Sequence, residues 1–273
     1  MRKPEKLAFV GYGEVGRLFS QQLRDLHGIA ISAYDIKLAD EDAAKPLIEA
    51  AEKSGVTLAA GASEAAVGAD IVISAVTASA AEEVARQAIR YLTADQIFFD
   101  INSAAPARKA RCGEALAVAG LSYVEGAVMA PVLAPGIRVP ILTGGARAGE
   151  LTEALTGLGM NLRAVSERIG RASATKLCRS IMIKGIEALI IDSARASAHW
   201  GVSEDVFGSL RDTFPSLDWA ELAKLMDKRV EKHGIRRAAE MREAADMLRD
   251  MGRDPKLAEA VADSHERRAR ERE

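Results

Sequence analysis

Three glycines near the start of the chain, Gly11, Gly13 and Gly16, have the Gly-x-Gly-x-x-Gly spacing that can hold the pyrophosphate of a dinucleotide. The spacing alone is weak evidence, because the chain has 22 glycines among 273 residues. A short apolar run precedes these glycines, however, and a helical pattern follows them. Gly11 would then make the tight turn, Gly13 would let the backbone approach the pyrophosphate, and Gly16 would let the helix pack closely on the strand.

An acidic residue completes this pattern. Asp35 ends the next apolar run, "IAISAYD", and follows Gly16 by 19 residues. A carboxylate there would accept from the ribose hydroxyls and repel a 2′-phosphate, which favours NAD. Lys37 lies nearby and leaves NADP possible. The predicted cofactor-binding residues of this part are Gly11, Tyr12, Gly13, Glu14, Val15, Gly16 and Asp35.

A second group of chemically capable residues lies in the middle of the chain. Lys176, Arg179, Ser180 and Lys184 follow one another at i, i+3, i+4 and i+8, so they share one broad face of a predicted helix. The other positions of that helix are mostly apolar. Charged groups are costly to bury without partners. The stripe is therefore either part of a site or the solvated face of a surface helix, and the spacing leaves both open.

The elements that position these residues alternate between strand and helix over roughly the first 165 residues. Such alternation is typical of a parallel sheet covered on both faces. Helical periods dominate from there to the end. We therefore expect an α/β Rossmann-type, doubly wound, mostly parallel sheet in residues 1–165 and an all-α domain in residues 166–273.

Composition excludes several classes of protein. The formal net charge is −2 and 48% of the residues are hydrophobic, so no overall basic field for nucleic acid is expected. No segment is long and apolar enough to span a bilayer, and we expect no membrane partner. The two cysteines, Cys112 and Cys178, have no metal-ligand spacing and are too few for a disulfide framework. We expect a cytoplasmic protein without a metal site.

The chain resembles the β-hydroxyacid dehydrogenase superfamily, which includes 3-hydroxyisobutyrate and 6-phosphogluconate dehydrogenases. The stretches that carry the resemblance are "FVGYGEVG", "ADIVISAVTAS", "DINSAAP" and "GRASATKLCRS". The resemblance implies that Val76 and Thr77 lie on the nicotinamide side of the cofactor, that Ser103 contacts substrate and that Lys176 is the catalytic lysine. The later residues look closest to an uncharacterised branch with a 6-phosphogluconate dehydrogenase-like C-terminal domain.

Two stretches depart from the family pattern. The family's substrate loop usually reads Asp-Ala-Pro-Val-Ser-Gly-Gly, whereas this chain has "EGAVMAP", with Ala130 and Pro131 in place of the glycine pair. Proline has no N–H to donate. Glu125, at the start of this stretch, is a possible site acid. After the lysine, Leu-Cys-Arg-Ser replaces the family's usual asparagine-containing pattern. These changes put the family's usual substrates in doubt, while the reaction class is kept.

The resemblance implies an NAD(P)-dependent oxidoreductase that transfers a hydride between the nicotinamide cofactor and a small hydroxy acid or alcohol. Lys176 would act as general acid and base, Arg179 would clamp an anionic substrate group, and Ser103 and Ser180 would supply neutral hydrogen bonds. The family pairs such helical domains, so we expect a homodimer. The roles of His233 and Arg236 stay open.

Two other functions remain compatible with the sequence. One is a dinucleotide-binding sensor or scaffold without hydride chemistry. The other keeps the fold and reduces imines. Lys176 separates the first from an enzyme, because a pure binder has no use for a cation beside the nicotinamide.

Overall fold

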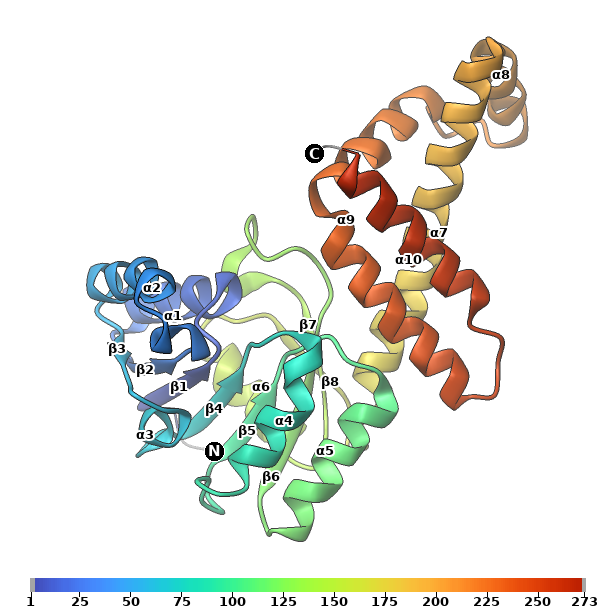
Figure 1. The fold of residues 1–273 in the computed structure, drawn as a ribbon. Helices are drawn as coiled ribbons and strands as arrows, with labels where there is room; N and C mark the ends of the chain where they lie inside the picture. The colour runs from blue at the N-terminus through green and yellow to red at the C-terminus, as the bar shows by residue number, and fades with distance from the viewer. Residues whose placement is uncertain (1–2, 272–273) are drawn as a thin grey trace. The chain divides into compact units, whose positions relative to one another are not determined.

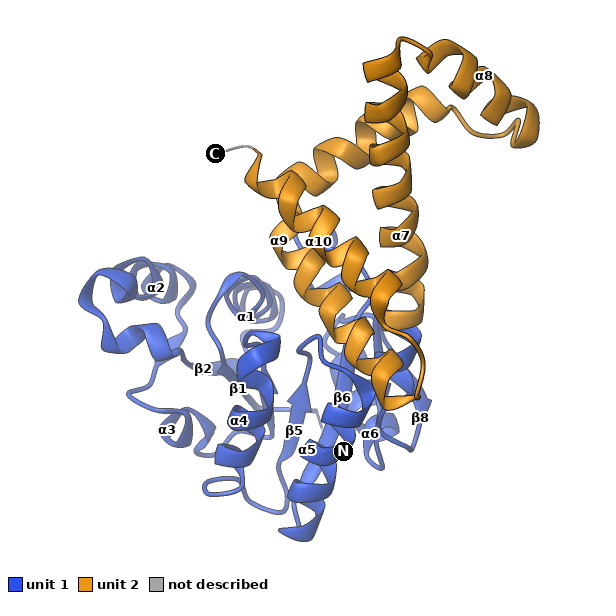
Figure 2. Cartoon of the chain, turned by 45° about the vertical axis from the view of Figure 1, so that its right-hand side comes forward, with its two compact units in different colours: residues 1–176 blue, residues 177–273 orange. Residues whose placement is uncertain are grey.

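The structure is a computed structural model that describes residues 3–271, and its chain divides into two compact units. Unit 1 comprises residues 1–176 and unit 2 residues 177–273 (Figure 2). The domain boundary expected from the sequence, between residues 165 and 166, stays a prediction.

Unit 1 is built on one eight-stranded sheet in the order β3-β2-β1-β4-β5-β6-β7-β8 (Figure 1). Every neighbouring pair is parallel except β6 and β7, which are antiparallel. The first six strands have the order of a Rossmann fold, 3-2-1-4-5-6. The expected fold class of this part is confirmed. The strands are β1 (Lys6–Val10), β2 (Ala30–Tyr34), β3 (Thr57–Leu58), β4 (Ile71–Ser74), β5 (Ile97–Asp100), β6 (Ser122–Val128), β7 (Ile141–Gly144) and β8 (Leu162–Ser166).

Helices cover both faces of this sheet. The central strands are buried on both sides, so successive residues point into two different cores. In β1, Phe9 belongs to one core and Ala8 to the other, and in β5 Phe99 and Phe98 divide in the same way. The first core is covered by α1 (Glu14–His27), α2 (Glu41–Ser54) and α6 (Ala148–Thr156), and the second by α3 (Ala62–Ala66), α4 (Ala78–Ala88) and α5 (Pro106–Val118). Two short 3₁₀ segments are η1 (Ile36–Ala39) and η2 (Gly136–Arg138).

The strand order reverses between β1 and β4, which places a switch point beside the glycine loop. The chain moves outward from β1 to β3 and then returns to the opposite side of β1 as β4. Ligands of open α/β sheets bind outside the carboxyl ends of the strands at such a point. The loops that follow β1, β2, β4 and β5 carry most of the cofactor and substrate residues expected from the sequence.

The described residues of unit 2 form helices joined by short loops, as expected. It contains most of α7 (Arg171–Trp200), which begins in unit 1, followed by α8 (Ser203–Thr213), α9 (Trp219–Asp250) and α10 (Lys256–Arg270). Helices α9 and α10 approach closely at Gly234, where a Cβ atom would overlap the carbonyl oxygen of His265. Gly234 is therefore required by packing.

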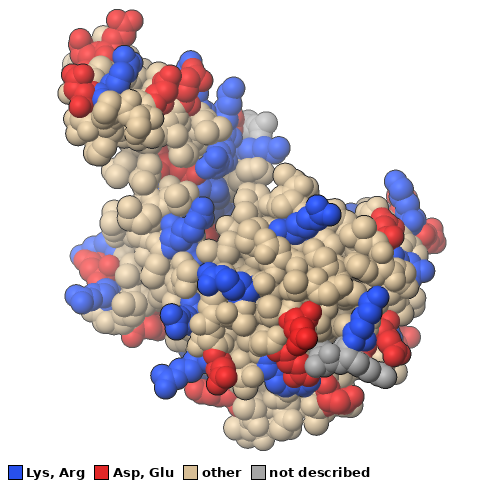
Figure 3. All heavy atoms as spheres, turned by 180° about the vertical axis from the view of Figure 1, so that it is seen from behind, with Lys and Arg blue, Asp and Glu red and all other residues tan. Residues whose placement is uncertain are grey.

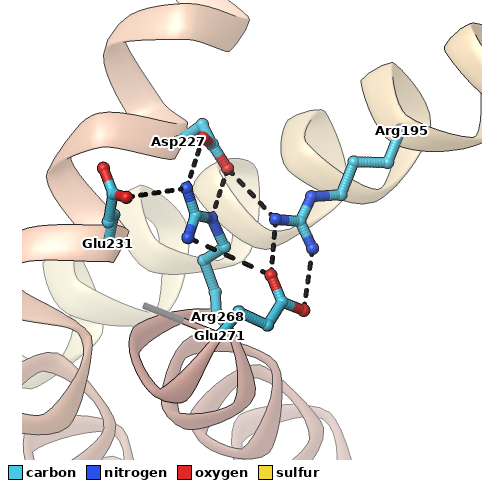
Figure 4. Close-up of polar contacts among 5 residues, drawn as sticks. All are labelled: Arg195, Asp227, Glu231, Arg268 and Glu271. Atoms are coloured by element: carbon cyan, nitrogen blue, oxygen red, sulfur yellow. Dashed lines mark hydrogen bonds and ion pairs between the residues drawn. The ribbon is translucent and has the colours of Figure 1, made fainter. Parts of the chain in front are cut away.

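A cluster of ion pairs ties three helices of unit 2 together (Figure 4). Arg268 of α10 forms two 2.7 Å hydrogen bonds with Asp227 of α9 and lies 3.5 Å from Glu231. Arg195 of α7 pairs with Glu271 at 3.0 and 2.7 Å. Hydrogen bonding from Arg268 lowers the pKa of Asp227 below its usual value. Bidentate geometry makes such pairs stronger than single surface contacts.

The surface carries charges of both signs. On the face shown in Figure 3, Lys and Arg side chains are interspersed with Asp and Glu. Among the described residues, no helix combines the length and hydropathy required of a transmembrane segment.

Candidate active site

The glycine loop has the geometry that a dinucleotide requires. Gly11 has a φ of 99°, and its N–H donates to the Tyr34 carbonyl oxygen at 2.8 Å. A Cβ at Gly11 would overlap the Ala75 carbonyl, and a Cβ at Gly16 would overlap the Gly11 carbonyl oxygen. Gly13 faces open space, with no heavy atom within 4 Å of a built Cβ. Two glycines thus allow close packing, and the third leaves the backbone open to a ligand.

The amino end of α1 is available to an anion. Gly13 is its N-cap residue, and no side chain makes a capping hydrogen bond there. The first N–H groups of such a helix lack partners within the helix and lie at the positive end of its dipole. A phosphate fits this arrangement. Of the neighbouring residues expected to contact cofactor, Glu14 is exposed, Val15 packs against the first core and the Tyr12 side chain is fully buried.

Asp35 is held at the carboxyl end of β2 by two backbone donors. Its Oδ2 accepts from the Tyr12 N–H at 2.8 Å, and its Oδ1 accepts from the Lys37 N–H at 3.0 Å. The first bond joins the acidic residue directly to the glycine loop. The carboxylate is partly exposed, so each oxygen has room to accept a further hydrogen bond from a ribose hydroxyl.

The loop after β4 borders the glycine loop. Val76 is partly buried against the second core, and its Cγ1 lies 2.9 Å from the position that a Cβ on Gly11 would take. Thr77 is exposed and is the N-cap residue of α4, with its hydroxyl 3.1 Å from that of Ser79. The expected nicotinamide contacts of Val76 and Thr77 stay predictions.

A buried polar cluster lies at the carboxyl end of β5. The Asp100 carboxylate receives Lys109 Nζ at 2.8 Å on Oδ1 and the Tyr123 hydroxyl at 2.7 Å on Oδ2. The Asn102 side-chain amide donates to Asp100 Oδ1 at 2.7 Å and to Ser74 Oγ at 2.9 Å. Burial, followed by the Asp100 charge, raises the pKa of Tyr123 well above its usual value, so its hydroxyl is a donor. We call these five residues the Asp100 cluster.

Two acceptors beside this cluster have no partner. Asn102 Oδ1 and Ser103 Oγ are buried, and neither makes a hydrogen bond among the described residues. Unpaired buried polar atoms are rare in folded proteins, so each one indicates a place where a ligand or a water molecule binds. Ser103 was expected to contact substrate, and that contact stays a prediction. Asn102 and Lys109 were not anticipated, although both lie within or just after the "DINSAAP" stretch.

Glu125 caps a helix. It is fully buried on β6, and its Oε1 accepts from the N–H groups of Gly170 at 2.6 Å and Ala172 at 3.0 Å. Its Oε2 accepts from the Ser173 hydroxyl at 2.7 Å and the Ser173 N–H at 3.3 Å. The carboxylate is thus committed to the first turn of α7. Glu125, a possible site acid from the sequence, therefore has a structural role as the cap of α7.

Lys176 lies one turn beyond this anchor. It is three residues after Ser173, so the two side chains are neighbours on one face of α7. Lys176 is partly exposed. The Glu125 cap therefore fixes the segment of α7 that carries the expected catalytic lysine, and the catalytic role itself stays a prediction.

The other residues of the expected cationic stripe belong to unit 2 and divide between surface and interior. Arg179 is exposed. Ser180 is buried and donates to Glu240 Oε1, the same oxygen that Lys184 Nζ approaches at 2.8 Å. Burial lowers the pKa of Lys184 from its usual value, and Glu240 opposes that effect. Ser180 and Lys184 are thus brought together by one carboxylate, while the substrate contacts expected for Arg179 and Ser180 stay predictions.

Both parts of the chain match known protein families. Residues 6–134 match the NAD binding domain of 6-phosphogluconate dehydrogenase. Residues 198–268 match a domain of unknown function, DUF1932. With the glycine loop and Asp35, the first match identifies an NAD(P)-binding domain.

Solved structures extend this likeness to almost the whole chain. A conserved hypothetical protein from Sinorhizobium meliloti is 38% identical, with a TM-score of 0.81 over 95% of this chain and 87% of that one. A conserved protein of unknown function, described as structurally similar to 3-hydroxyacid dehydrogenases, is 28% identical, with a TM-score of 0.78 over 98% of both chains. The 3-hydroxyisobutyrate dehydrogenase of Mycobacterium tuberculosis, determined with L-serine, shares the fold at 16% identity, with a TM-score of 0.77 over 96% of this chain and 93% of that one.

Proposed function

This chain belongs to a β-hydroxyacid dehydrogenase-like family with an uncharacterised C-terminal domain, and we propose that it is an NAD(P)-dependent oxidoreductase acting on a small hydroxy acid or alcohol. The observation that carries the proposal is the fit of the glycine loop to a dinucleotide. Gly13 is open to a ligand, the amino end of α1 has no side-chain cap, and Asp35 is bonded to the loop through the Tyr12 N–H.

Asp35 favours NAD over NADP in this proposal. Its carboxylate is fixed at the end of β2 by the Tyr12 and Lys37 N–H groups. A fixed negative charge accepts from ribose hydroxyls and repels a 2′-phosphate. The Lys37 side chain is exposed and offers a counter-charge, which leaves NADP as a weaker alternative.

Lys176 supplies the acid–base chemistry. When bound, NAD(P) supplies the hydride acceptor or donor. Oxidation of an alcohol also releases a proton from the substrate oxygen, and Lys176 takes that proton as general base and returns it as general acid in the reverse direction. In its ammonium form it stabilises the alkoxide that develops. The Glu125 cap holds this part of α7 in place.

Substrate binding is assigned to Ser103, Arg179 and Ser180. The unpartnered Ser103 hydroxyl can donate to or accept from the substrate. The Arg179 guanidinium can hold a carboxylate in a bidentate pair, so the substrate is expected to be anionic. Ser180 would have to exchange its Glu240 partner for the substrate, which makes it the weakest of the three assignments.

A homodimer is part of the proposal. Within unit 2, α7 exposes Met182, Ile186 and Leu189 at 62%, 39% and 71%. Their spacing of i, i+4 and i+7 places them along one side of the helix, while Ile190 and Ile191 are buried. An exposed apolar side of a helix often marks an interaction surface, and a second copy would cover this one.

The test is a substrate screen followed by one substitution. Hydroxy acids, alcohols and cyclic imines are screened with NAD⁺, NADP⁺ and their reduced forms by nicotinamide absorbance. With the substrate found, Lys176→Met keeps the aliphatic stem and removes the charge. We expect kcat to fall by about 10³, because general acid–base help is worth roughly 10²–10⁴, while NAD affinity changes little.

Two further variants make the comparison specific. Arg179→Met should mainly raise KM for anionic substrates, since a clamp used in ground and transition states is uniform binding. Lys45→Met removes an exposed lysine paired with Asp42 on α2 and should change neither constant. A Lys176→Met enzyme with near wild-type turnover would remove the lysine from the mechanism. Dinucleotide binding without turnover of any substrate would favour a sensor or scaffold.

A further inference from the structure

The orientation of the Asn102 side chain is fixed by its neighbours. Asn102 is 5% exposed, and one terminal atom of its amide lies 2.7 Å from Asp100 Oδ1 and 2.9 Å from Ser74 Oγ. An ionised carboxylate only accepts hydrogen bonds, so the atom facing Asp100 must be the amide nitrogen. The Asn102 Oδ1 atom therefore points away from this pair, and it has no partner.

Lys109 and Tyr123 maintain Asp100 as an acceptor. Lys109 Nζ lies 2.8 Å from Asp100 Oδ1 and donates to the Asp100 carbonyl oxygen at 2.9 Å. The Tyr123 hydroxyl donates to Oδ2 at 2.7 Å. The Lys109 and Asp100 side chains are each 1% exposed, so the pair is shielded from water. The buried charge pair thus fixes which end of the Asn102 amide is left over.

Asn102 Oδ1 can only accept a hydrogen bond, and its position in the fold indicates which group donates to it. Asn102 follows β5 directly, within the second half of the dinucleotide-binding sheet, formed by β4, β5 and β6. The two halves of a Rossmann sheet each receive one mononucleotide. Asp35 and the glycine loop belong to the half that takes the adenosine side. The half containing Asn102 is left for the nicotinamide nucleotide, whose carboxamide and ribose hydroxyls are donors.

We propose that Asn102 accepts a hydrogen bond from the nicotinamide nucleotide of bound NAD(P), and that Lys109 and Tyr123 are positioning residues that fix its amide through Asp100. The inference rests on the dinucleotide site of the proposed function and is independent of hydride transfer. It also explains why a buried acceptor is left without a partner in the chain, which is otherwise costly.

The first experiment compares two ligands by isothermal titration calorimetry. Asn102→Ala should bind NAD⁺ about tenfold more weakly, the loss expected for one hydrogen bond. It should bind ADP as the wild type does, because ADP lacks the nicotinamide nucleotide. Gln96→Ala is the matched control: Gln96 is another buried amide, donating to Ala66 and Ala69 just before β5 begins. That variant should lower the melting temperature and leave both affinities unchanged.

The second experiment tests the positioning roles. Tyr123→Phe and Lys109→Met should each weaken NAD⁺ binding by about three- to tenfold and leave ADP binding unchanged. Combined with Asn102→Ala, neither should weaken it further, because residues that act through Asn102 lose their effect once its side chain is gone. Tyr123→Phe removes a single hydroxyl and carries this test if Lys109→Met does not fold.

A third titration identifies the donor. In 3-acetylpyridine adenine dinucleotide, a methyl ketone replaces the carboxamide. If wild type and Asn102→Ala bind this analogue equally, the carboxamide is the donor, and a retained difference assigns the ribose hydroxyls. Equal losses of NAD⁺ and ADP affinity in Asn102→Ala, no loss of either, or additive effects in the double variants would each overturn the inference. A wild-type protein that binds neither ligand would overturn the proposed function as well.

Discussion

The buried carboxylate of Glu125 gives the most direct test of how this fold positions Lys176. Glu125→Gln keeps the shape of the side chain and removes its charge and one of its two oxygens. The carboxylate accepts four hydrogen bonds in the first turn of α7, two on each oxygen. Gly144 leaves the space for it, since a Cβ there would lie 2.6 Å from Glu125 Oε1.

The cost of this substitution follows from those contacts. A glutamine carbonyl oxygen can keep the pair of hydrogen bonds on one side, but its NH₂ group faces donors on the other. Hydrogen bonds to a charged group are worth about 1.5–3 kcal/mol each, so two lost bonds cost about 3 kcal/mol. The lost interaction with the helix dipole adds about 1 kcal/mol. We expect the first turn of α7 to be destabilised by about 4 kcal/mol, out of a total stability of roughly 5–15 kcal/mol.

Hydrogen–deuterium exchange measures this locally, and urea unfolding measures it globally. The amides of Gly170, Ala172 and Ser173 should exchange about 10³-fold faster in Glu125→Gln, the factor that corresponds to 4 kcal/mol. Asp40→Asn is the matched control. Asp40 caps α2 at an exposed position by accepting from two N–H groups at 3.1 and 2.9 Å, and asparagine caps equally well.

The role of Glu125 is refuted if Glu125→Gln lowers the free energy of unfolding no more than Asp40→Asn does, or if the amides of Gly170, Ala172 and Ser173 exchange at wild-type rates. Either result would mean that α7 is held at its start by packing rather than by the buried carboxylate. A loss of stability with unchanged exchange at α7 would place the damage elsewhere in the sheet.

Three other predictions concern the cofactor, pH and assembly. Asp35→Ala should weaken NAD binding and reduce any preference for NAD over NADP. The preference is measured as the ratio of kcat/KM with NAD to kcat/KM with NADP, and an unchanged ratio would refute the role of Asp35 in cofactor choice. Burial lowers the pKa of His265 from 6.5 to about 4, so the unfolded chain binds the proton first as the pH falls. Stability should therefore drop by about 3 kcal/mol between pH 6.5 and 4, and urea titrations should show a flatter profile in His265→Gln but not in His199→Gln. Leu189→Glu, on the exposed face of α7, should convert a dimer to a monomer in light scattering, whereas Leu257→Glu on α10 should not; a wild-type monomer would contradict the dimer itself.

The cofactor half of the fold could be predicted because its signals are local. The strand, glycine loop and helix occupy consecutive residues, and glycine is needed at these positions because of the local backbone conformation and packing. The positive φ of Gly11 and the tight approach of Gly16 to the Gly11 carbonyl are both set within a few residues. The bonds from the Gly11 N–H to Tyr34 and from the Tyr12 N–H to Asp35 each span 23 residues, and the regular length of a βαβ unit makes that spacing predictable.

The buried polar contacts could not be predicted because they join distant segments. Glu125 meets Ser173 across 48 residues, and Tyr123 meets Asp100 across 23. An isolated glutamate in an apolar strand has the same local pattern whether it caps a helix or serves as an acid. The fold decides between them by placing four N–H and O–H donors around it. β8 was also not predicted, because its residues are partly exposed and lack the apolar run of a central strand.

The difference between these two cases also explains why the sequence identifies a cofactor more readily than a substrate. A pyrophosphate is bound largely by backbone N–H groups, so the residues needed are those that shape the backbone, and glycine marks them. A substrate is selected by side chains that separate segments bring together, as in the proposed roles of Ser103 after β5 and Lys176 on α7. Buried carboxylates hold residues beside both: Asp100 binds the Asn102 side chain, and Glu125 caps the segment that carries Lys176. Specificity in this family is therefore expected to change through such supporting residues as much as through the residues that touch the substrate.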